Sequence, residues 1–531
     1  MDARRRHLAA AALAGSLTAS MLAACSGGDP TPPDGRGIDA ASYYEDYESD
    51  EADRAYGSTR SYATGGAQSD GSADAEPEIP GPLEDDTFVD AGTSGFVDTG
   101  VDARSTFALD VDTGSWNVAQ TLLAGGLLPP PESIRVEEWV NALPAALPRP
   151  EDTVGVTGES AAAPGLPERT ELVRVGVATR PVRADDRRPV SVTLVVDRSG
   201  SMDIRDRLGL VQSSLALLAD GLRDDDTVSV VSFEDRARPL LEPTPVSDTD
   251  AILSAIEELT PGGSTNLEAG LRLGYEQARE SFREDATNIV VLASDGVANV
   301  GATGPGSIVD RIREEGADGI HLVTVGYGMG NYNDHLMEQL ADLGDGFYAY
   351  VDDFDEAERL FRDELTTALV PVADDARVQV AFDPAVVTSY RLVGYDNRDL
   401  ADAAFTDASA DAGELGAGHH ATALYEVQLA DGVAPGTPLG TAAVRWTPVD
   451  GGPQREASVG LVASGGTPPT GALALESVVA DLAHVLKQAA PYAERGVTLA
   501  ALEERAAALE EGGVPGATTV LETVRLARRA A

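Results

Sequence analysis

Four short runs of β-branched and aliphatic residues constrain this chain of 531 residues more than any other feature. They occupy 190–196, 227–233, 288–293 and 320–327. Each run is too short to cross a membrane and is typical of a strand that is buried on both faces. Amphipathic segments with helical period lie between and after the runs, at 207–222, 250–259, 266–282, 307–315 and 333–343. This alternation predicts an α/β fold, with a doubly wound, mostly parallel, Rossmann-like sheet in a unit that spans 189–370.

The regions on the two sides of this unit have different patterns. Residues 371–465 contain short strand-like runs separated by Gly and Pro turns, which predicts a β-rich, sandwich-like flanking domain. Helical periodicity returns in a C-terminal region, 466–531. Before the α/β unit, an N-terminal flanking region covers 105–188 and includes a strand-like run at 171–179. We leave open whether that run belongs to the sandwich, which would make the α/β unit an insertion into it.

Residues 1–24 resemble a secretory signal peptide. Three arginines precede an Ala/Leu-rich stretch, and the sequence then matches a bacterial lipobox, in which Cys25 would be diacylated. Cys25 is the only cysteine of the chain, which excludes an intrachain disulfide and a Cys-based zinc site. We therefore expect an extracytoplasmic protein, lipid-anchored to the cell membrane or envelope through Cys25 and exported by the Sec or the twin-arginine route.

The segment that follows, 25–104, is acidic and contains few aliphatic side chains. It cannot bury enough apolar surface to offset chain entropy, so it is predicted to be a disordered, extended tether. The whole chain carries 39 Lys and Arg residues against 88 Asp and Glu, a formal net charge of −49. Because a surface of this charge repels phosphate backbones, nucleic acid is excluded as a partner.

Oxygen-bearing side chains follow the predicted strands where an α/β unit binds its ligand. The first apolar run ends at Asp197, with Ser199 and Ser201 in the next loop. Thr265 lies in a Gly-Gly-Ser-Thr-Asn turn that opens a helix, and Asp295 follows the third run. In a doubly wound sheet these loops meet beyond the carboxyl ends of the strands. All five donors are hard oxygens, without His or Cys, which favours Mg²⁺ (or Mn²⁺ or Ca²⁺) over zinc.

The mixture of hydroxyls and carboxylates predicts how this site would work. Neutral Ser and Thr hydroxyls can bind the ion directly, while the two aspartates act through bound waters. The ion then keeps much of its positive charge and one position held by a replaceable water. An Asp or Glu side chain of a protein partner can take that position, so the pattern predicts a carboxylate receptor.

The string Asp197-x-Ser199-x-Ser201, together with Thr265 and Asp295, resembles the metal-ion-dependent adhesion site (MIDAS) of von Willebrand factor type A (vWA) domains. A wider resemblance, to a subfamily of surface-anchored bacterial lipoproteins with flanking domains on both sides of the vWA domain, rests on five further segments. They are 105–113, 135–139, 328–334, 390–395 and 416–419. The resemblance implies a vWA fold and metal-dependent protein binding or adhesion.

Enzyme alternatives fit the pattern less well. A phosphatase of the haloacid dehalogenase type needs an acid where Ser199 stands and a nearby lysine, whereas the only lysine, Lys487, lies outside the α/β unit. A serine hydrolase needs a paired histidine, but His321 lies just inside a predicted strand and no Gly-x-Ser-x-Gly elbow occurs. No Gly-Lys-Ser/Thr phosphate loop occurs either. We therefore expect no catalytic residues.

Two functions remain open from the sequence. In the first, the protein captures a partner carboxylate through the metal. In the second, it is an envelope scaffold or assembly factor whose metal site is mainly structural and whose flanking domains make the contacts. Asn331, Tyr332, Asn333 and Asp334 follow a strand at the same rim, where they either contact a partner or cap the next helix.

Overall fold

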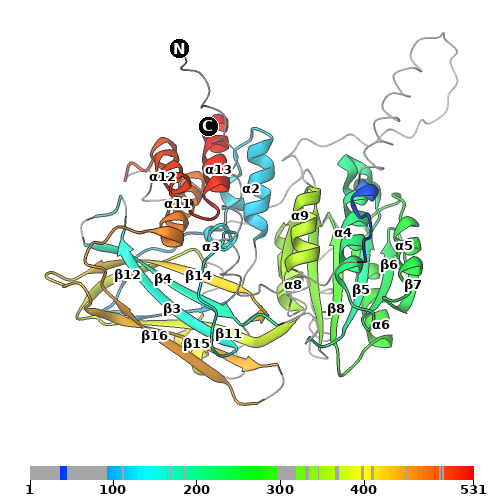
Figure 1. Ribbon diagram of the computed structural model, residues 1–531, viewed down its shortest axis with the longest axis horizontal. Helices are drawn as coiled ribbons and strands as arrows, with labels where there is room; N and C mark the ends of the chain where they lie inside the picture. Colours follow the sequence, from blue (N-terminus) through cyan, green and yellow to red (C-terminus); the bar gives the residue numbers. More distant parts are fainter. Residues whose placement is uncertain are drawn as a thin grey trace, which may run out of the picture.

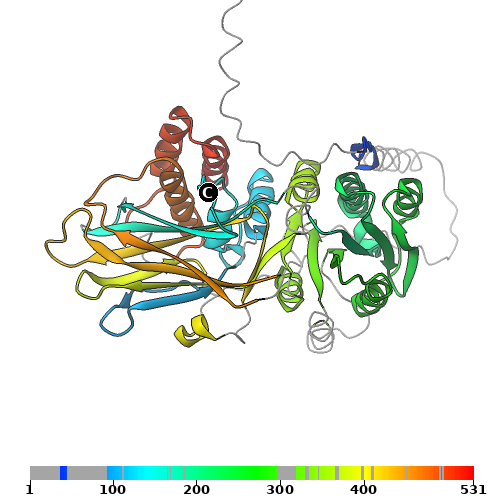
Figure 2. The ribbon, with the colours of Figure 1, turned by 60° about the horizontal axis from the view of Figure 1, so that its bottom comes forward.

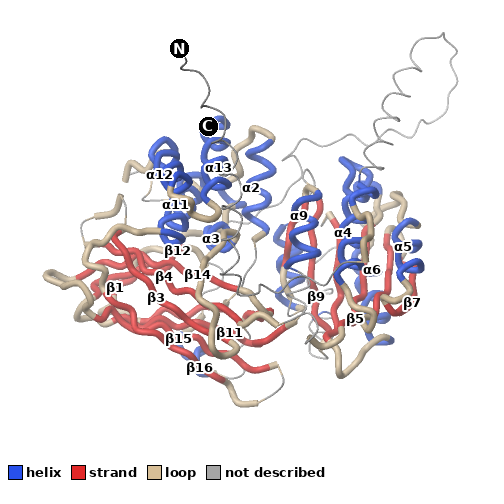
Figure 3. Tube along the Cα trace, viewed as in Figure 1, coloured by secondary structure: helices blue, strands red, loops and turns tan. Residues whose placement is uncertain are grey.

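The computed structural model places an α/β unit beside a β-sandwich that is covered by helices (Figure 1). In Figure 3 the strands of the sandwich lie below a group of helices, and the α/β unit stands to their right. The structure describes residues 36–44, 92–109, 113–163, 165–167, 169–182, 187–295, 312, 319–328, 334–344, 346–364, 370–395, 400–407, 412–449, 452–489, 492 and 495–531.

A six-stranded sheet in the order β10-β9-β8-β5-β6-β7 forms the centre of the α/β unit. All neighbours from β10 to β6 pair in parallel, and β7 pairs with β6 antiparallel at the edge. The strands are β5 (Val190–Asp197), β6 (Thr227–Phe233), β7 (Ala237–Pro245), β8 (Thr287–Ser294), β9 (Ile320–Tyr327) and β10 (Tyr348–Val351). The helices are α4 (Arg207–Gly221), α5 (Thr249–Glu257), α6 (Leu267–Glu280), α8 (Asp334–Leu343) and α9 (Phe354–Glu358). The predicted doubly wound, mostly parallel fold is confirmed.

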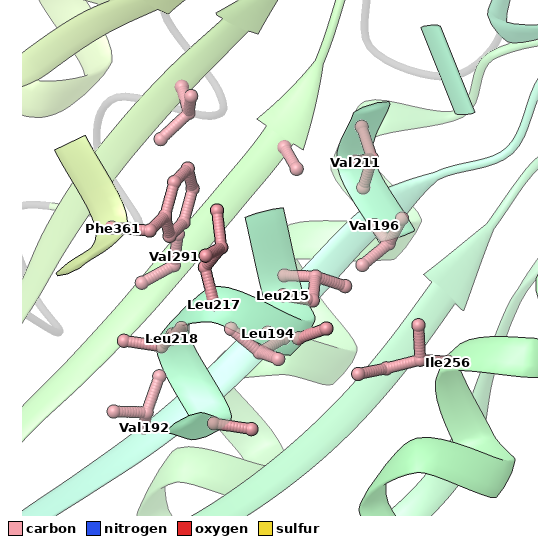
Figure 4. Packing of buried hydrophobic residues seen from close by; sticks show 14 of the residues in the cluster. Val192, Leu194, Val196, Val211, Leu215, Leu217, Leu218, Ile256, Val291 and Phe361 are labelled. Atoms are coloured by element: carbon pink, nitrogen blue, oxygen red, sulfur yellow. The ribbon is translucent and has the colours of Figure 1, made fainter. Parts of the chain in front are cut away.

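Both faces of this sheet are covered, which explains why its strands are apolar at nearly every position. Val192 and Leu194 of β5 pack in one cluster with α4, α5 and α9, while Val195 packs in another with α6 and α8. Figure 2 shows helices on both faces of the sheet. Figure 4 shows part of the first cluster, in which Leu215 and Leu218 of α4 lie over β5. Alternate residues of one strand therefore serve two separate apolar layers.

Two antiparallel sheets form the sandwich, in the orders β1-β12-β14-β4-β3 and β13-β11-β15-β16, with β2 paired to β11. The strands before the α/β unit are β1 (Val97–Asp98), β2 (Arg104–Ala108), β3 (Val154–Ala162) and β4 (Thr170–Thr179). Those after it are β11 (Pro371–Phe382), β12 (Val387–Val393), β13 (Gly413–Gly416), β14 (His420–Leu429), β15 (Pro438–Pro448) and β16 (Arg455–Val462). Because β4 pairs with β14 along its length, the α/β unit interrupts the sandwich between β4 and β11.

A helical layer covers the sandwich and reaches the α/β unit. It contains α2 (Gly114–Ala124), α3 (Val136–Asn141), α11 (Gly471–Leu486), α12 (Leu499–Glu511) and α13 (Ala517–Ala530). Helix α2 is buried on two sides. Val118 and Leu122 join the apolar cluster that contains α6 and α8, whereas Trp116 and Leu123 join the cluster of the helical layer. One helix thus joins the two bodies through apolar contacts on both of its faces.

A buried ion pair adds a second link between the two bodies. Arg135, directly before α3, places Nη2 2.7 Å from Glu338 Oε2 in α8, and both side chains are almost fully buried. Glu138 follows in the same segment and accepts a hydrogen bond from the Ser115 N–H at the start of α2, at 2.7 Å. The acidic and basic residues of the 135–139 segment therefore hold the junction between α2, α3 and α8.

Part of the predicted tether is ordered. Residues 36–44 (blue in Figure 1) lie against the end of α4, where Ala40 is buried and Tyr43 packs on the same cluster as α4. Arg36 Nη2 donates to the Leu222 carbonyl oxygen at 3.1 Å, and Ile38 N–H donates to Asp220 Oδ1 at 3.2 Å. A few apolar side chains and two hydrogen bonds thus hold residues 36–44 against α4. The prediction that the tether is disordered throughout is wrong for this segment. The prediction also fails near its end, because β1 and the start of β2 belong to the sandwich.

The remaining helical elements are short. They are the 3₁₀ helices η2 (Pro131–Ser133), η4 (Gly200–Asp206) and η6 (Asp402–Thr406), and the π-helix η5 (Arg359–Glu364) that continues α9. Within the described parts of the chain, no helix has both the length and the apolar character needed to cross a lipid bilayer.

Candidate metal centre

The five predicted donors lie near the carboxyl ends of the central strands. Asp197 is the last residue of β5, and Asp295 directly follows β8, which pairs with β5 in parallel. Both carboxyl groups are fully buried. Ser199 and Thr265 are also buried, and Ser201 is partly exposed. The parallel register brings the two acidic loops to one edge of the sheet, as the spacing along the chain predicts.

Backbone hydrogen bonds tie the loop that carries Thr265 to the first loop. Gly200 N–H donates to the Gly263 carbonyl oxygen at 3.0 Å, and Gly262 N–H donates to the Arg198 carbonyl oxygen at 2.8 Å. Gly263 has φ of +83°, a left-handed conformation that glycine adopts without strain. The Gly-Gly pair therefore shapes the turn that positions Thr265 beside the Asp197 loop.

Both carboxylate oxygens of Asp197 accept hydrogen bonds from neighbouring groups. Ser199 N–H donates to Oδ1 at 2.8 Å, and Ser294 Oγ donates to Oδ2 at 2.7 Å. The Ser199 and Ser201 hydroxyl oxygens lie 3.1 Å from each other. Asp197 is thus a fixed acceptor, and two hydroxyls converge beside it. This arrangement suits the two hydroxyls as direct ligands of a cation. Asp197 would then contact the ion indirectly, through a bound water.

The charge balance of the site is unusual for a buried location. Burial, and then the neighbouring Asp295 carboxylate, raise the pKa of Asp197 to about 7, although its hydrogen bonds from Ser199 and Ser294 act in the opposite direction. A cation bound near the two carboxylates would stabilise their ionised forms and so oppose this upward shift. The donor set therefore fits a hard divalent cation.

One charged residue of the site was not among the residues predicted from sequence. Arg207, the first residue of α4, places Nη1 3.1 Å from Asp295 Oδ2 and 3.4 Å from the Ser201 carbonyl oxygen. It is almost completely buried. The signal in the sequence is an arginine six positions after Ser201, at the start of a largely apolar helix that contains no other basic residue.

The donor set differs from sites built on acidic and histidine clusters. Within the described residues, no group of three or more His, Cys, Asp and Glu side chains could hold a metal ion. The predicted site has only two carboxylates, and hydroxyls supply its other protein donors. Asn331, Tyr332 and Asn333, predicted at the rim, lie outside the described residues, as does Cys25, while Asp334 begins α8.

Comparison with known proteins assigns families to three parts of the chain. The von Willebrand factor type A domain model matches residues 191–363. A model described as "Uncharacterized protein YfbK, C-terminal" matches residues 367–446, which contain strands of the sandwich. A third model, described as von Willebrand factor, matches residues 82–174 on the other side.

Two bacterial relatives extend over more than the α/β unit. YfbK of Escherichia coli is 38% identical over 337 residues, which are 61% of this chain and 58% of YfbK. The protein sll0103 of Synechocystis is 32% identical over 198 residues, 37% of this chain and 46% of that protein. The chain thus spans about half the length of the curated relatives it matches. Among solved structures, the von Willebrand factor type A from Catenulispora acidiphila has a TM-score of 0.39 at 16% identity, covering 60% of this chain and 76% of its own.

The match of the α/β unit, the match that follows it and the two bacterial relatives agree with one another. The chain therefore contains a von Willebrand factor type A domain at 191–363, followed by a region that matches the C-terminal model of YfbK.

Proposed function

We propose that this protein is a binding module, without enzymatic activity, that captures an acidic side chain of a protein partner through a divalent metal ion. Mg²⁺, or else Mn²⁺ or Ca²⁺, would be held by Asp197, Ser199, Ser201, Thr265 and Asp295. The bound ion would supply a Lewis-acidic position that accepts a carboxylate oxygen. A vWA domain, the type of domain found here, commonly mediates protein interactions, which supports binding rather than catalysis.

The observation that carries this proposal is the buried pair of carboxylates, Asp197 and Asp295, at the end of the central strands. Arg207 compensates only one of these two like charges, and a buried charge that remains is costly unless a cation balances it. The two serine hydroxyls converge next to Asp197, on the partly exposed side where Ser201 lies. Asp197, with both oxygens engaged, would orient the groups around it and not bind the ion directly.

We further propose that the protein acts outside the cytoplasm and is held to the membrane by a lipid on Cys25. The Arg-rich start and the lipobox-like residues before Cys25 support this location. A membrane-held receptor would present its metal site to proteins of the envelope or of a neighbouring surface.

Metal binding can be tested without knowing the partner. Mn²⁺ is titrated into the full chain, and free Mn²⁺ is measured by electron paramagnetic resonance. The variants Asp197→Ala and Thr265→Ala are expected to lose tight Mn²⁺ binding while they keep the far-UV circular dichroism of the wild type. Asp235→Asn is the matched control, because Asp235 is a carboxylate beside the same turn that bonds Ser264 and lies outside the predicted donor set. Equal Mn²⁺ binding by all four proteins would refute the site.

The captured group is tested in a second step. Acetate, added to the Mn²⁺-loaded chain, is expected to displace a metal-bound water and to lower the water-proton relaxation rate, while chloride has no such effect. An envelope extract is then passed over the immobilised chain with Mg²⁺ or with EDTA. Retention that survives both EDTA and Asp197→Ala would contradict metal-dependent capture and favour the alternative, a scaffold that binds through its flanking domains.

A further inference from the structure

Arg207 is enclosed at the candidate metal centre by three separate segments. Its Nη1 contacts Asp295 Oδ2 after β8 and the Ser201 carbonyl oxygen in the first loop. After β9, Gly328 leaves space for the guanidinium group, because a Cβ atom there would lie 2.1 Å from Arg207 Nε. Gly328 also has φ of +74°, which glycine adopts without strain. The fold therefore reserves a place for this cation beside the carboxylates.

The formal charges of the site follow from these contacts. Asp197 and Asp295 together carry two negative charges when ionised, and Arg207 carries one positive charge. Without metal, these three groups sum to one negative charge, and the buried Asp352 carboxyl group, whose pKa burial raises and Arg207 lowers, adds to the negative side when it is ionised. A dication brings the sum of the three groups to one positive charge, and a partner carboxylate then brings it to zero. Neither the metal alone nor the carboxylate alone achieves neutrality, and unbalanced buried charge is unfavourable.

We propose that Arg207 is a built-in cation that couples the two binding events, so that metal and acidic partner bind much more tightly together than separately. This inference rests on the proposed function and adds a regulation to it. In the absence of a partner, Arg207 compensates Asp295 and opposes the entry of a dication by charge repulsion. Once the dication is bound, the same positive charge favours an incoming carboxylate. By thermodynamic reciprocity, the partner must raise metal affinity by the factor by which the metal raises partner affinity.

This role differs from that of an ordinary structural ion pair. Arg187 and Asp226 form such a pair elsewhere in the domain, just before β5 and β6, with two guanidinium–carboxylate hydrogen bonds and both side chains buried. Arg187 is far along the strand from the carboxyl ends, where the donors lie. Arg187→Gln is therefore a matched control, which removes a buried cation of equal charge without touching the metal centre.

The test measures Mn²⁺ affinity of the full chain with and without acetate, in the wild type, Arg207→Gln, Arg207→Lys and Arg187→Gln. In the wild type, acetate is expected to tighten Mn²⁺ binding. In Arg207→Gln, Mn²⁺ alone is expected to bind roughly tenfold more tightly, because the repelling charge is gone, and acetate should have little further effect. Arg207→Lys keeps the charge and should keep the coupling, and Arg187→Gln should behave like the wild type.

Thermal unfolding gives a second measurement. In EDTA, Arg207→Gln and Arg187→Gln should both melt at lower temperature than the wild type, because each removes a buried guanidinium from a buried carboxylate. Mn²⁺ should restore only Arg207→Gln. Unchanged Mn²⁺ affinity in Arg207→Gln, or loss of the acetate effect in Arg207→Lys, would overturn the role of Arg207.

The two proposals fail in different ways. If the wild type binds Mn²⁺ no better than Asp197→Ala, the metal centre itself is wrong, and the role of Arg207 is wrong with it. If Mn²⁺ binding depends on Asp197 but not on the charge at position 207, the metal centre remains and only the coupling is refuted. Should Arg207→Gln not fold, Arg207→Lys still tests the coupling, because loss of the acetate effect in a variant that keeps the charge would overturn the role of Arg207.

Discussion

His484, in α11, is fully enclosed where the helical layer meets the sandwich, and it carries a prediction that ordinary unfolding experiments can test. Its ring stacks on Tyr492 with centroids 4.0 Å apart, and Nδ1 lies 2.7 Å from the Ala480 carbonyl oxygen. Burial, and then the positive charge of Arg391, lower the pKa of His484 to about 3. The imidazole therefore stays neutral in the folded protein well below the pH at which a free histidine takes up its proton.

The sign of the effect on stability follows from this pKa. A histidine in the unfolded chain has a pKa near 6.5. Below that pH the unfolded chain therefore binds a proton that His484 does not bind in the folded state. Because the pKa of His484 is lower in the folded state, its contribution to stability is fully present above about pH 6.5. This contribution falls as the pH drops toward 3. At about 1.4 kcal/mol per pH unit, the free energy of unfolding at pH 5 is lower by about 2 kcal/mol than at pH 8 through this residue alone.

The variant His484→Phe keeps a ring against Tyr492 and removes the titration. At pH 8 it should be less stable than the wild type by about 1 kcal/mol, because the hydrogen bond to Ala480 is lost. At pH 5 the order should reverse, and the variant should be more stable by about 1 kcal/mol. Other titrating groups are common to both proteins and largely cancel in this comparison.

Urea unfolding followed by tryptophan fluorescence measures this difference. Trp116 and Trp139 belong to the same apolar cluster as α11, so the Trp446→Phe background confines the signal to that cluster. Leu473→Ala is a control in α11 that involves no titrating group. It should lower the free energy of unfolding by the same amount at pH 8 and at pH 5. A difference between the wild type and His484→Phe that stays constant from pH 8 to pH 5 would refute the assignment of a neutral, enclosed imidazole.

Three further changes test the packing. Arg135→Met should lower the free energy of unfolding by about 3–5 kcal/mol in urea titrations, because the buried Glu338 carboxylate loses its ion pair with Arg135. Gly274→Ala should cost about 1–3 kcal/mol by the same method, since its Cβ would lie 2.3 Å from a β5 side chain, whereas Gly460→Ala meets nothing within 4 Å. Leu215→Ala, in the cluster of Figure 4, should lower thermal stability by roughly 2–5 kcal/mol. Costs below about 0.5 kcal/mol would contradict each assignment.

The central sheet was predictable because its strands are buried on both faces. The run at 190–196 becomes β5, one residue longer, and the helix predicted at 266–282 becomes α6, two residues shorter at its end and one at its start. Strand β7 was missed, since its segment contains three prolines that a central strand would not tolerate. It lies at the edge of the sheet, where a missing N–H donor is harmless.

The loops that carry the candidate donors could be predicted from the sequence, but the charged residue that pairs with Asp295 could not. The positions of Asp197 and Asp295 follow from strand ends, which sequence patterns locate well. The pairing of Arg207 with Asp295 depends on how a helix start and a distant loop meet in space, and no local pattern encodes that contact. The same holds for Arg135 and Glu338, which are two hundred and three positions apart in the chain.

The segment 36–44 also bears on which way the candidate centre would face. It is fastened to the far end of α4, the helix that starts at Arg207, and fifteen residues at 1.5 Å each place these two points about 20 Å apart on opposite poles of the α/β unit. Cys25 precedes Arg36 by eleven positions, which span at most about 40 Å when fully stretched. With the proposed lipid on Cys25, the end of α4 that holds 36–44 would lie nearer the bilayer, and the candidate centre, at the other end of α4, would face away from it.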